Sequence, residues 1–170
     1  PEQRIVLGRL DREDIERDSG DLKPSFPAED FAEAIRVAHE HGAKVTAHCF
    51  GEAVLPGLIN AGIDCLEHGT GLSEDLIDEM VARGTALVPT AMQLNNFPEY
   101  ASAAAEKFPT YAAHMRDLHS RRRDTIMAAY EAGVAIYAGT DAGGVLPHGQ
   151  ISGEVRELSG YGFSAEAALG

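Results

Sequence analysis

Short apolar runs rich in β-forming residues alternate with segments of helical periodicity along most of this chain. The runs that predict strands are residues 44–48, 63–67, 85–89 and 134–138, with a further short candidate over 5–10. Helices are expected over residues 28–40, 52–60, 73–83 and 111–132. A strand and a helix recur about every 20 to 30 residues, which is typical of βα units that build a parallel sheet. The sequence therefore predicts an α/β fold made of parallel (β/α) units.

The segments between and after these units carry weaker signals. Residues 90–109 are expected to be irregular, and residues 154–158 and 165–169 are expected to form helical fragments. Ser73 is expected to be the N-cap of the helix that follows it, because acidic residues fill the first turn after it.

Three of the expected strands end in a polar residue that is followed by glycine. The residues are His48, His68 and Asp141, and they precede Gly51, Gly69 and Gly143. The carboxyl ends of parallel strands lie on one side of a sheet, so these side chains are expected to project into one region. Imidazole and carboxylate are common ligands of zinc and similar divalent metals. The trio therefore predicts a shared metal or acid–base site, although Asp141 alone also suits a turn and a lone histidine is more often structural.

Other candidate residues are weaker. His148 lies in the loop just after Asp141, where contact with a substrate and capping of the loop are equally favoured. Tyr111 begins the long helix and is a candidate substrate contact, although a packing role is favoured. His114 and His119 are five residues apart on the same helix and are expected to lie on the surface.

Composition excludes some classes of partner. The chain has 14 basic and 27 acidic residues and a net charge of −13, which disfavours nucleic acid and anionic membrane as partners. Its single basic run, residues 121–123, suits a solvated or acid-pairing helix face. No bilayer-spanning run or secretory signal is expected. Cys49 and Cys65 match no zinc or redox spacing, so buried free thiols in the cytoplasm are expected.

Three motifs resemble the second half of an amidohydrolase-superfamily enzyme. They are residues 45–51 (VTAHCFG), 64–71 (DCLEHGTG) and 138–144 (AGTDAGG), in the order that the imidazolonepropionase-like and Xaa-Pro-dipeptidase-like branch shows. The resemblance covers residues 20–170, whereas residues 1–19 match poorly. It implies part of a TIM-type (β/α)8 barrel, about strands 5 to 8, with His48, His68 and Asp141 on the fifth, sixth and eighth strands.

The same resemblance implies an activity. Enzymes of this family hydrolyse C–N bonds with water that a divalent metal activates, so an amide, cyclic amide or dipeptide is the expected small-molecule substrate. His48, His68 and Asp141 correspond to metal ligands, with Asp141 also the general base, and one or two ions, zinc by default, are expected.

Two family features have no counterpart here. No His-x-His pair lies on a strand, because His39 and His41 fall on an expected helix, and residues 4–10 contain no lysine or glutamate to bridge two metals. The chain is thus expected to be about half a barrel. Such a piece needs the missing N-terminal half or a second copy of itself to cover its open edges and apolar face. A catalytically inactive half-barrel with a structural or assembly role is the alternative.

Overall fold

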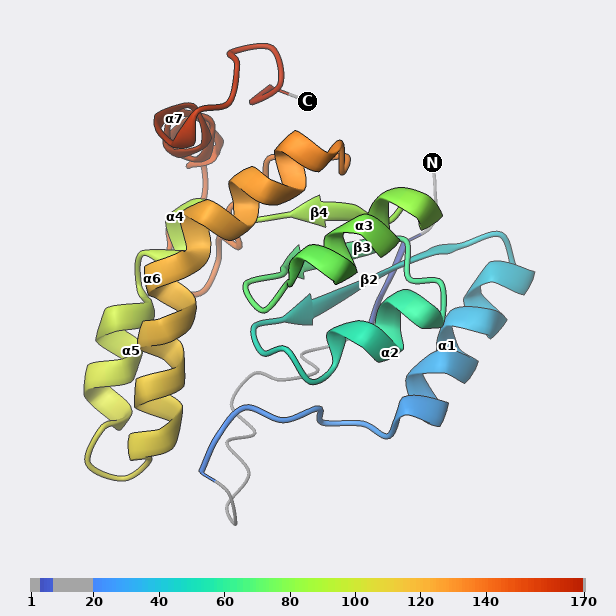
Figure 1. The fold of residues 1–170 in the computed structure, drawn as a ribbon, viewed down its shortest axis with the longest axis horizontal. Helices are drawn as coiled ribbons and strands as arrows, with labels where there is room; N and C mark the ends of the chain where they lie inside the picture. Colours follow the sequence, from blue (N-terminus) through green and yellow to red (C-terminus); the bar gives the residue numbers. More distant parts are fainter. Residues whose placement is uncertain (1–3, 8–19, 170) are drawn as a thin grey trace.

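A four-stranded parallel sheet forms the centre of the molecule (Figure 1). The computed structural model describes residues 4–7 and 20–169. The strands are β1 (Arg4–Leu7), β2 (Lys44–Cys49), β3 (Cys65–His68) and β4 (Ala86–Val88), and each pairs with its neighbour in sequence. The predicted parallel βα arrangement is confirmed. Of the strand expected over 5–10, residues 8–10 lie outside the described part.

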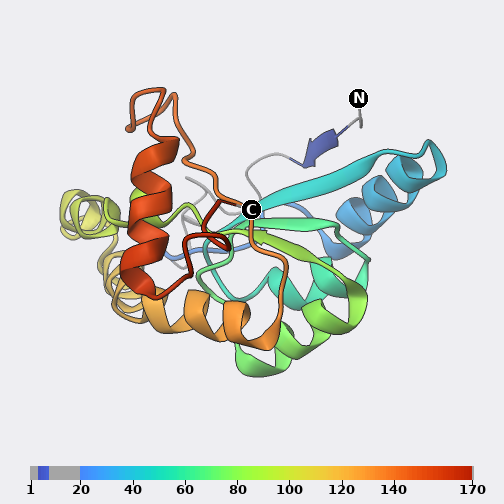
Figure 2. The same ribbon diagram turned by 90° about the horizontal axis from the view of Figure 1, so that it is seen from above.

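Three helices cover one face of the sheet, as Figure 2 shows for the teal and green helices. They are α1 (Ala28–Glu40), α2 (Leu55–Asn60) and α3 (Glu74–Arg83). The apolar faces of these helices pack on the strand residues Val45, Ala47, Leu66 and Leu87, and together they form a first core. Ser73 holds the N-cap position of α3, but its side chain makes no capping hydrogen bond.

The second half of the chain is more helical than predicted. Residues 90–109, expected to be irregular, contain α4 (Ala91–Leu94) and α5 (Phe97–Ala104). Pro98 lies in the first turn of α5, where proline costs little because that N–H has no helical acceptor. The long helix α6 (Pro109–Ala132) packs beside α5, and α7 (Ile151–Tyr161) replaces the expected 154–158 fragment. Residues 165–169 form turns instead of a helix.

These helices enclose a second core. Phe97, Met115, Leu118 and Leu158 are fully buried in it, and Phe50 joins it from the loop after β2. The second core thus reaches the carboxyl end of the sheet. No helix within the described residues is long and apolar enough to cross a membrane.

The strand predicted over residues 134–138 is present only as an isolated bridge. Leu87 pairs with Ile136 through two hydrogen bonds, from the Leu87 N–H to Ala135 and from the Tyr137 N–H to Leu87, each of 2.9 Å. The partner strand β4 ends before Pro89, which has no N–H to extend the ladder. The side chain of Tyr137 is 51% exposed on the face of the sheet that α1, α2 and α3 do not cover.

Candidate functional site

His48 and His68 meet at the carboxyl ends of β2 and β3. His48 is opposite Glu67 in the register, so His68 is opposite Cys49, whose side chain belongs to the helix-covered core. Regular alternation would therefore turn His68 away from His48. A φ of 67° at His68 breaks the alternation and directs its ring to the open face.

The two imidazoles are in direct contact. The Nε2 atom of His68 lies 2.7 Å from the Nδ1 atom of His48, and the Nδ1 atom of His68 lies 2.5 Å from the Oγ1 atom of Thr90. His68 is fully buried, and burial, with the nearby His48 second, holds the pKa of His68 well below its usual value. His68 is therefore neutral near pH 7, which is the form that binds a metal.

Backbone strain is concentrated at these strand ends. In the described part of the chain, the non-glycine residues with positive φ are His68, Thr90 and Asp141, at 67°, 50° and 50°. Each of them follows or ends a parallel strand or bridge. Such conformations cost of order 1–3 kcal/mol and persist where the surrounding structure holds them, often at functional sites.

A cavity of about 820 Å³ connects His48 with Asp141. Its wall is mainly apolar and aromatic, from the loop after β2, helices α5 and α6 and the glycine loop after Asp141. The side chains that carry charge or hydrogen-bonding groups into it, besides His48 and Asp141, are Gln93, Tyr100, Lys107 and Tyr111. His48 and Asp141 therefore line the same cavity, whereas convergence of all three side chains on one site stays a prediction.

The loops that follow β2 and β3 hold one another closely. The Thr70 hydroxyl donates a hydrogen bond of 2.7 Å to the Phe50 carbonyl, and the Gly69 N–H donates one of 3.1 Å to Cys49. A Cβ atom on Gly71 would lie 2.7 Å from the backbone nitrogen of Glu52, so only glycine fits there. This backbone contact fixes the spacing of the two histidines.

The weaker sequence candidates have mixed positions. Tyr111 lines the cavity, as expected of a substrate contact. His148 is exposed, and its ring packs over Gly143 at the cavity edge. His114 was expected on the surface, but its side chain is only 20% exposed and binds two carboxylates, because loops from distant parts of the sequence fold against that side of α6. Their roles stay predictions.

Sequence reasoning missed two residues that hold the histidine pair. Thr90 binds His68, and the Phe50 ring lies with its centroid 4.5 Å from that of His48 and 4.7 Å from that of His68. Phe50 is two residues after His48 in the motif of residues 45–51, so its closeness in sequence to His48 could have predicted a contact between the two rings. Thr90 lies in the segment expected to be irregular, and only the αL turn after β4 brings it to His68.

The donor set suits a divalent metal in kind. Two imidazole nitrogens face each other, and a carboxylate lines the same cavity as His48. His48 and His68 would hold a divalent cation there if each ring presented an unprotonated nitrogen to it. Within residues 4–7 and 20–169, no three His, Cys, Asp or Glu side chains gather closely enough to hold a metal ion by themselves.

Comparison with known proteins places this site in context. The family model described as the amidohydrolase family matches residues 21–169. Uncharacterised proteins from Mycobacterium bovis and Mycobacterium tuberculosis are 56% identical over 156 residues, which is 92% of this chain. The chain spans 42% of the length of these relatives.

Solved structures show the same fold. A Xaa-Pro dipeptidase with methionine bound in its active site is 29% identical, with a TM-score of 0.76 over 98% of this chain and 40% of the dipeptidase. Ochratoxinase from A. niger is 26% identical, with a TM-score of 0.71 over 86% of this chain and 32% of the enzyme. The expected partial barrel is confirmed, and the chain belongs to the amidohydrolase family.

Proposed function

We propose that the full-length protein is a metal-dependent hydrolase that cleaves the C–N bond of an amide, cyclic amide or dipeptide. The observation that carries this proposal is the contact of His68 with His48, which lines the same cavity as Asp141. Imidazole and carboxylate are the side-chain types that hold divalent metals, and a strained backbone such as that at His68 and Asp141 often occurs at functional sites.

His48, His68 and Asp141 would hold the cation, zinc by default. In that site the Thr90 hydroxyl oxygen would accept the Nδ1–H of His68, so that Nε2, which faces His48, would be the unprotonated nitrogen. A bound divalent cation supplies a water of lowered pKa and polarises the scissile carbonyl. The further ligands and strands are proposed to come from the rest of the full-length protein, since this chain spans 42% of its relatives.

Asp141 is the proposed general base. It takes the proton from the attacking water as the C–O bond forms, and it delivers that proton to the leaving nitrogen as the C–N bond breaks. The permissive loop after Asp141, with Gly143 and Gly144 in the cavity wall, leaves space for the scissile group beside the carboxylate.

The cavity favours a substrate with an apolar body. Leu22, Phe50 and Phe108 form much of its wall, with Tyr100 and Tyr111 adding polar hydroxyls. A protein from Bifidobacterium longum described as a putative prolidase is 26% identical, with a TM-score of 0.69 over 83% of this chain and 37% of that protein. Similarity to this protein and to the Xaa-Pro dipeptidase makes dipeptides the first substrates to try.

The test is hydrolysis of a panel of Xaa-Pro dipeptides and N-acyl amino acids by the zinc-loaded full-length protein. We expect turnover that falls at least about 100-fold in Asp141→Asn, because the proton acceptor is lost. His39→Gln, which removes the pair between His39 on α1 and Asp64 outside the cavity, is the matched control and should keep full activity. Absence of hydrolysis across the panel with zinc bound would contradict the proposal and favour an inactive barrel with a structural or assembly role.

A further inference from the structure

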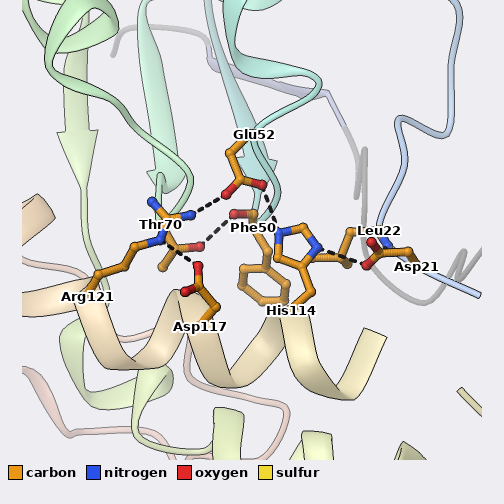
Figure 3. Close-up of polar contacts among 8 residues, drawn as sticks. All are labelled: Asp21, Leu22, Phe50, Glu52, Thr70, His114, Asp117 and Arg121. Carbon is orange, nitrogen blue, oxygen red and sulfur yellow. Dashed lines mark hydrogen bonds and ion pairs between the residues drawn. The ribbon is translucent and has the colours of Figure 1, made fainter. Parts of the chain in front are cut away.

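Helix α6 holds the loop after β2 through a cluster of ion pairs (Figure 3). The Nε2 atom of His114 lies 2.8 Å from Glu52, and its Nδ1 atom lies 2.8 Å from Asp21. Arg121 lies seven residues after His114 on the same helix. It pairs with the other oxygen of Glu52 and with Asp117. We call His114, Arg121, Glu52 and Asp21 the α6 clamp.

Each carboxylate of the α6 clamp is next to a residue of the cavity wall. Asp21 precedes Leu22 and accepts its N–H at 2.7 Å, and Glu52 lies two residues after Phe50. Tyr111, one helical turn before His114, also lines the cavity, and its N–H donates to the Gly20 carbonyl at 3.0 Å. His114 therefore connects the segments of Asp21 and Glu52 to helix α6, as Figure 3 shows. Each of these three segments contributes a residue to the cavity wall.

A single imidazole can bind two carboxylates only when both ring nitrogens carry a proton. The hydrogen bond with Glu52 is the largest of the effects that raise the pKa of His114 to about 9, and His114 in turn lowers the pKa of Glu52. His114 is thus charged near pH 7. The His114 side chain is only 20% exposed, so solvent screens this pair less than it screens a fully exposed ion pair.

We propose that His114 is a positioning residue of the candidate active site, which fixes the substrate-facing wall formed by Leu22, Phe50 and Tyr111 against the strand ends. The inference rests on the proposed hydrolase function for its kinetic consequence, although the fixing of the two loops does not depend on it. The spacing of His48 and His68 is also held by contacts outside the α6 clamp, from Thr90 to His68 and from the Gly69 N–H to Cys49, so we expect loss of the clamp to act first on the substrate-facing wall.

The first test is amide hydrogen exchange in the full-length protein, because it needs no substrate. In His114→Gln we expect the amides of residues 20–22 and 50–52 to exchange about 10-fold faster, since local opening of these loops becomes easier. His39→Gln, the matched loss of a histidine–carboxylate pair, should leave them unchanged. Unchanged exchange in His114→Gln would overturn the proposal. If His114→Gln does not fold, the same amides are measured in Glu52→Gln, and unchanged exchange there would overturn the proposal in the same way.

The second test separates positioning from chemistry. With the dipeptide that the wild type hydrolyses best, His114→Gln should raise KM about 10-fold and leave kcat within about two-fold, because the wall binds substrate and transition state alike. A loss of kcat with KM unchanged would contradict the proposal. If no peptide is hydrolysed, the proposed function fails, and the exchange experiment still decides the role of His114.

The pH profile gives a third readout. The charged groups that face His114 are Asp21 and Glu52, with Arg121 and Asp117 beside them on α6. The pKa of His114 is raised by folding, so its contribution is complete below pH about 6.5 and is lost as the pH rises through about 9. The ratio of KM in His114→Gln to that in the wild type should therefore fall toward one by about pH 10. A ratio that does not change with pH would contradict a clamp that depends on the imidazolium.

Discussion

At the scale of single residues, the candidate site depends on side chains that hold the ligands as much as on the ligands themselves. His68 is buried between His48 and Thr90, and its unusual φ of 67° is what brings it to the open face. His48, His68 and Asp141 could be predicted from residue type and position at strand ends. Thr90 could not be predicted, because its contact with His68 depends on a backbone turn that the local sequence pattern does not indicate.

Replacing Thr90 by valine tests this holding role. Thr90→Val removes the partner of a buried ring nitrogen, so we expect the protein to lose about 1–3 kcal/mol of stability and about 10-fold in zinc affinity. Thr85→Val is the control, because the Thr85 hydroxyl is also buried and donates to the Ile63 carbonyl at 3.0 Å, away from the cavity. Thermal unfolding and zinc competition titration measure the two effects. Equal zinc affinity in Thr90→Val and Thr85→Val would contradict a role for Thr90 at the metal site.

At the scale of elements, the strands and helices on the covered face of the sheet followed the sequence closely. Helix α1 was predicted at its observed bounds, and β2 and β3 differ from the predicted strands by one or two residues, because apolar periodicity reports burial directly. The misses lie where tertiary structure overrides local pattern. Helix α5 was not predicted, because a proline such as Pro98 usually indicates an irregular segment. The strand over 134–138 lacks pairing beyond Leu87, because strand formation needs a partner as well as β-propensity.

Contact between the loops after β2 and β3 gives an element-scale prediction. In Gly71→Ala the new methyl group would overlap the backbone of Gly51 and Glu52, at 2.8 and 2.7 Å, so the loops must separate. We expect a loss of about 1–3 kcal/mol, measured by urea unfolding. Gly160→Ala, at a helical position with open space around it, should instead be neutral or stabilise by up to about 1 kcal/mol. Similar stability of the two variants would contradict the close packing of these loops.

At the scale of the whole molecule, one face of the sheet is covered by helices and the other carries partly exposed side chains. Tyr137, Ile151 and Leu169 border a second, shallower cavity of about 470 Å³ next to the isolated bridge, and Leu169 is 73% exposed. Apolar groups gathered at a sheet edge usually mark a surface that another part of an assembly covers. We propose that the remaining strands of the barrel cover it in the full-length protein.

This arrangement predicts different behaviour for the chain alone and for the full-length protein. The isolated 170-residue chain should bind a hydrophobic dye and self-associate in sedimentation velocity, because its open face finds no other cover. The full-length protein should bind little dye, since its own strands complete the barrel. A monomeric isolated chain that binds no more dye than the full-length protein would contradict this account.

The most direct measurement of the central claim is the zinc content of the purified full-length protein, by elemental analysis after dialysis. The account predicts at least one tightly bound zinc in the wild type, a loss in His48→Ala and His68→Ala, and retention in His39→Ala, which lies on α1 outside the cavity. Metal-free wild-type protein, or full zinc retention in His48→Ala and His68→Ala, would show that the contact between these two imidazoles is structural and that the metal-dependent mechanism is wrong.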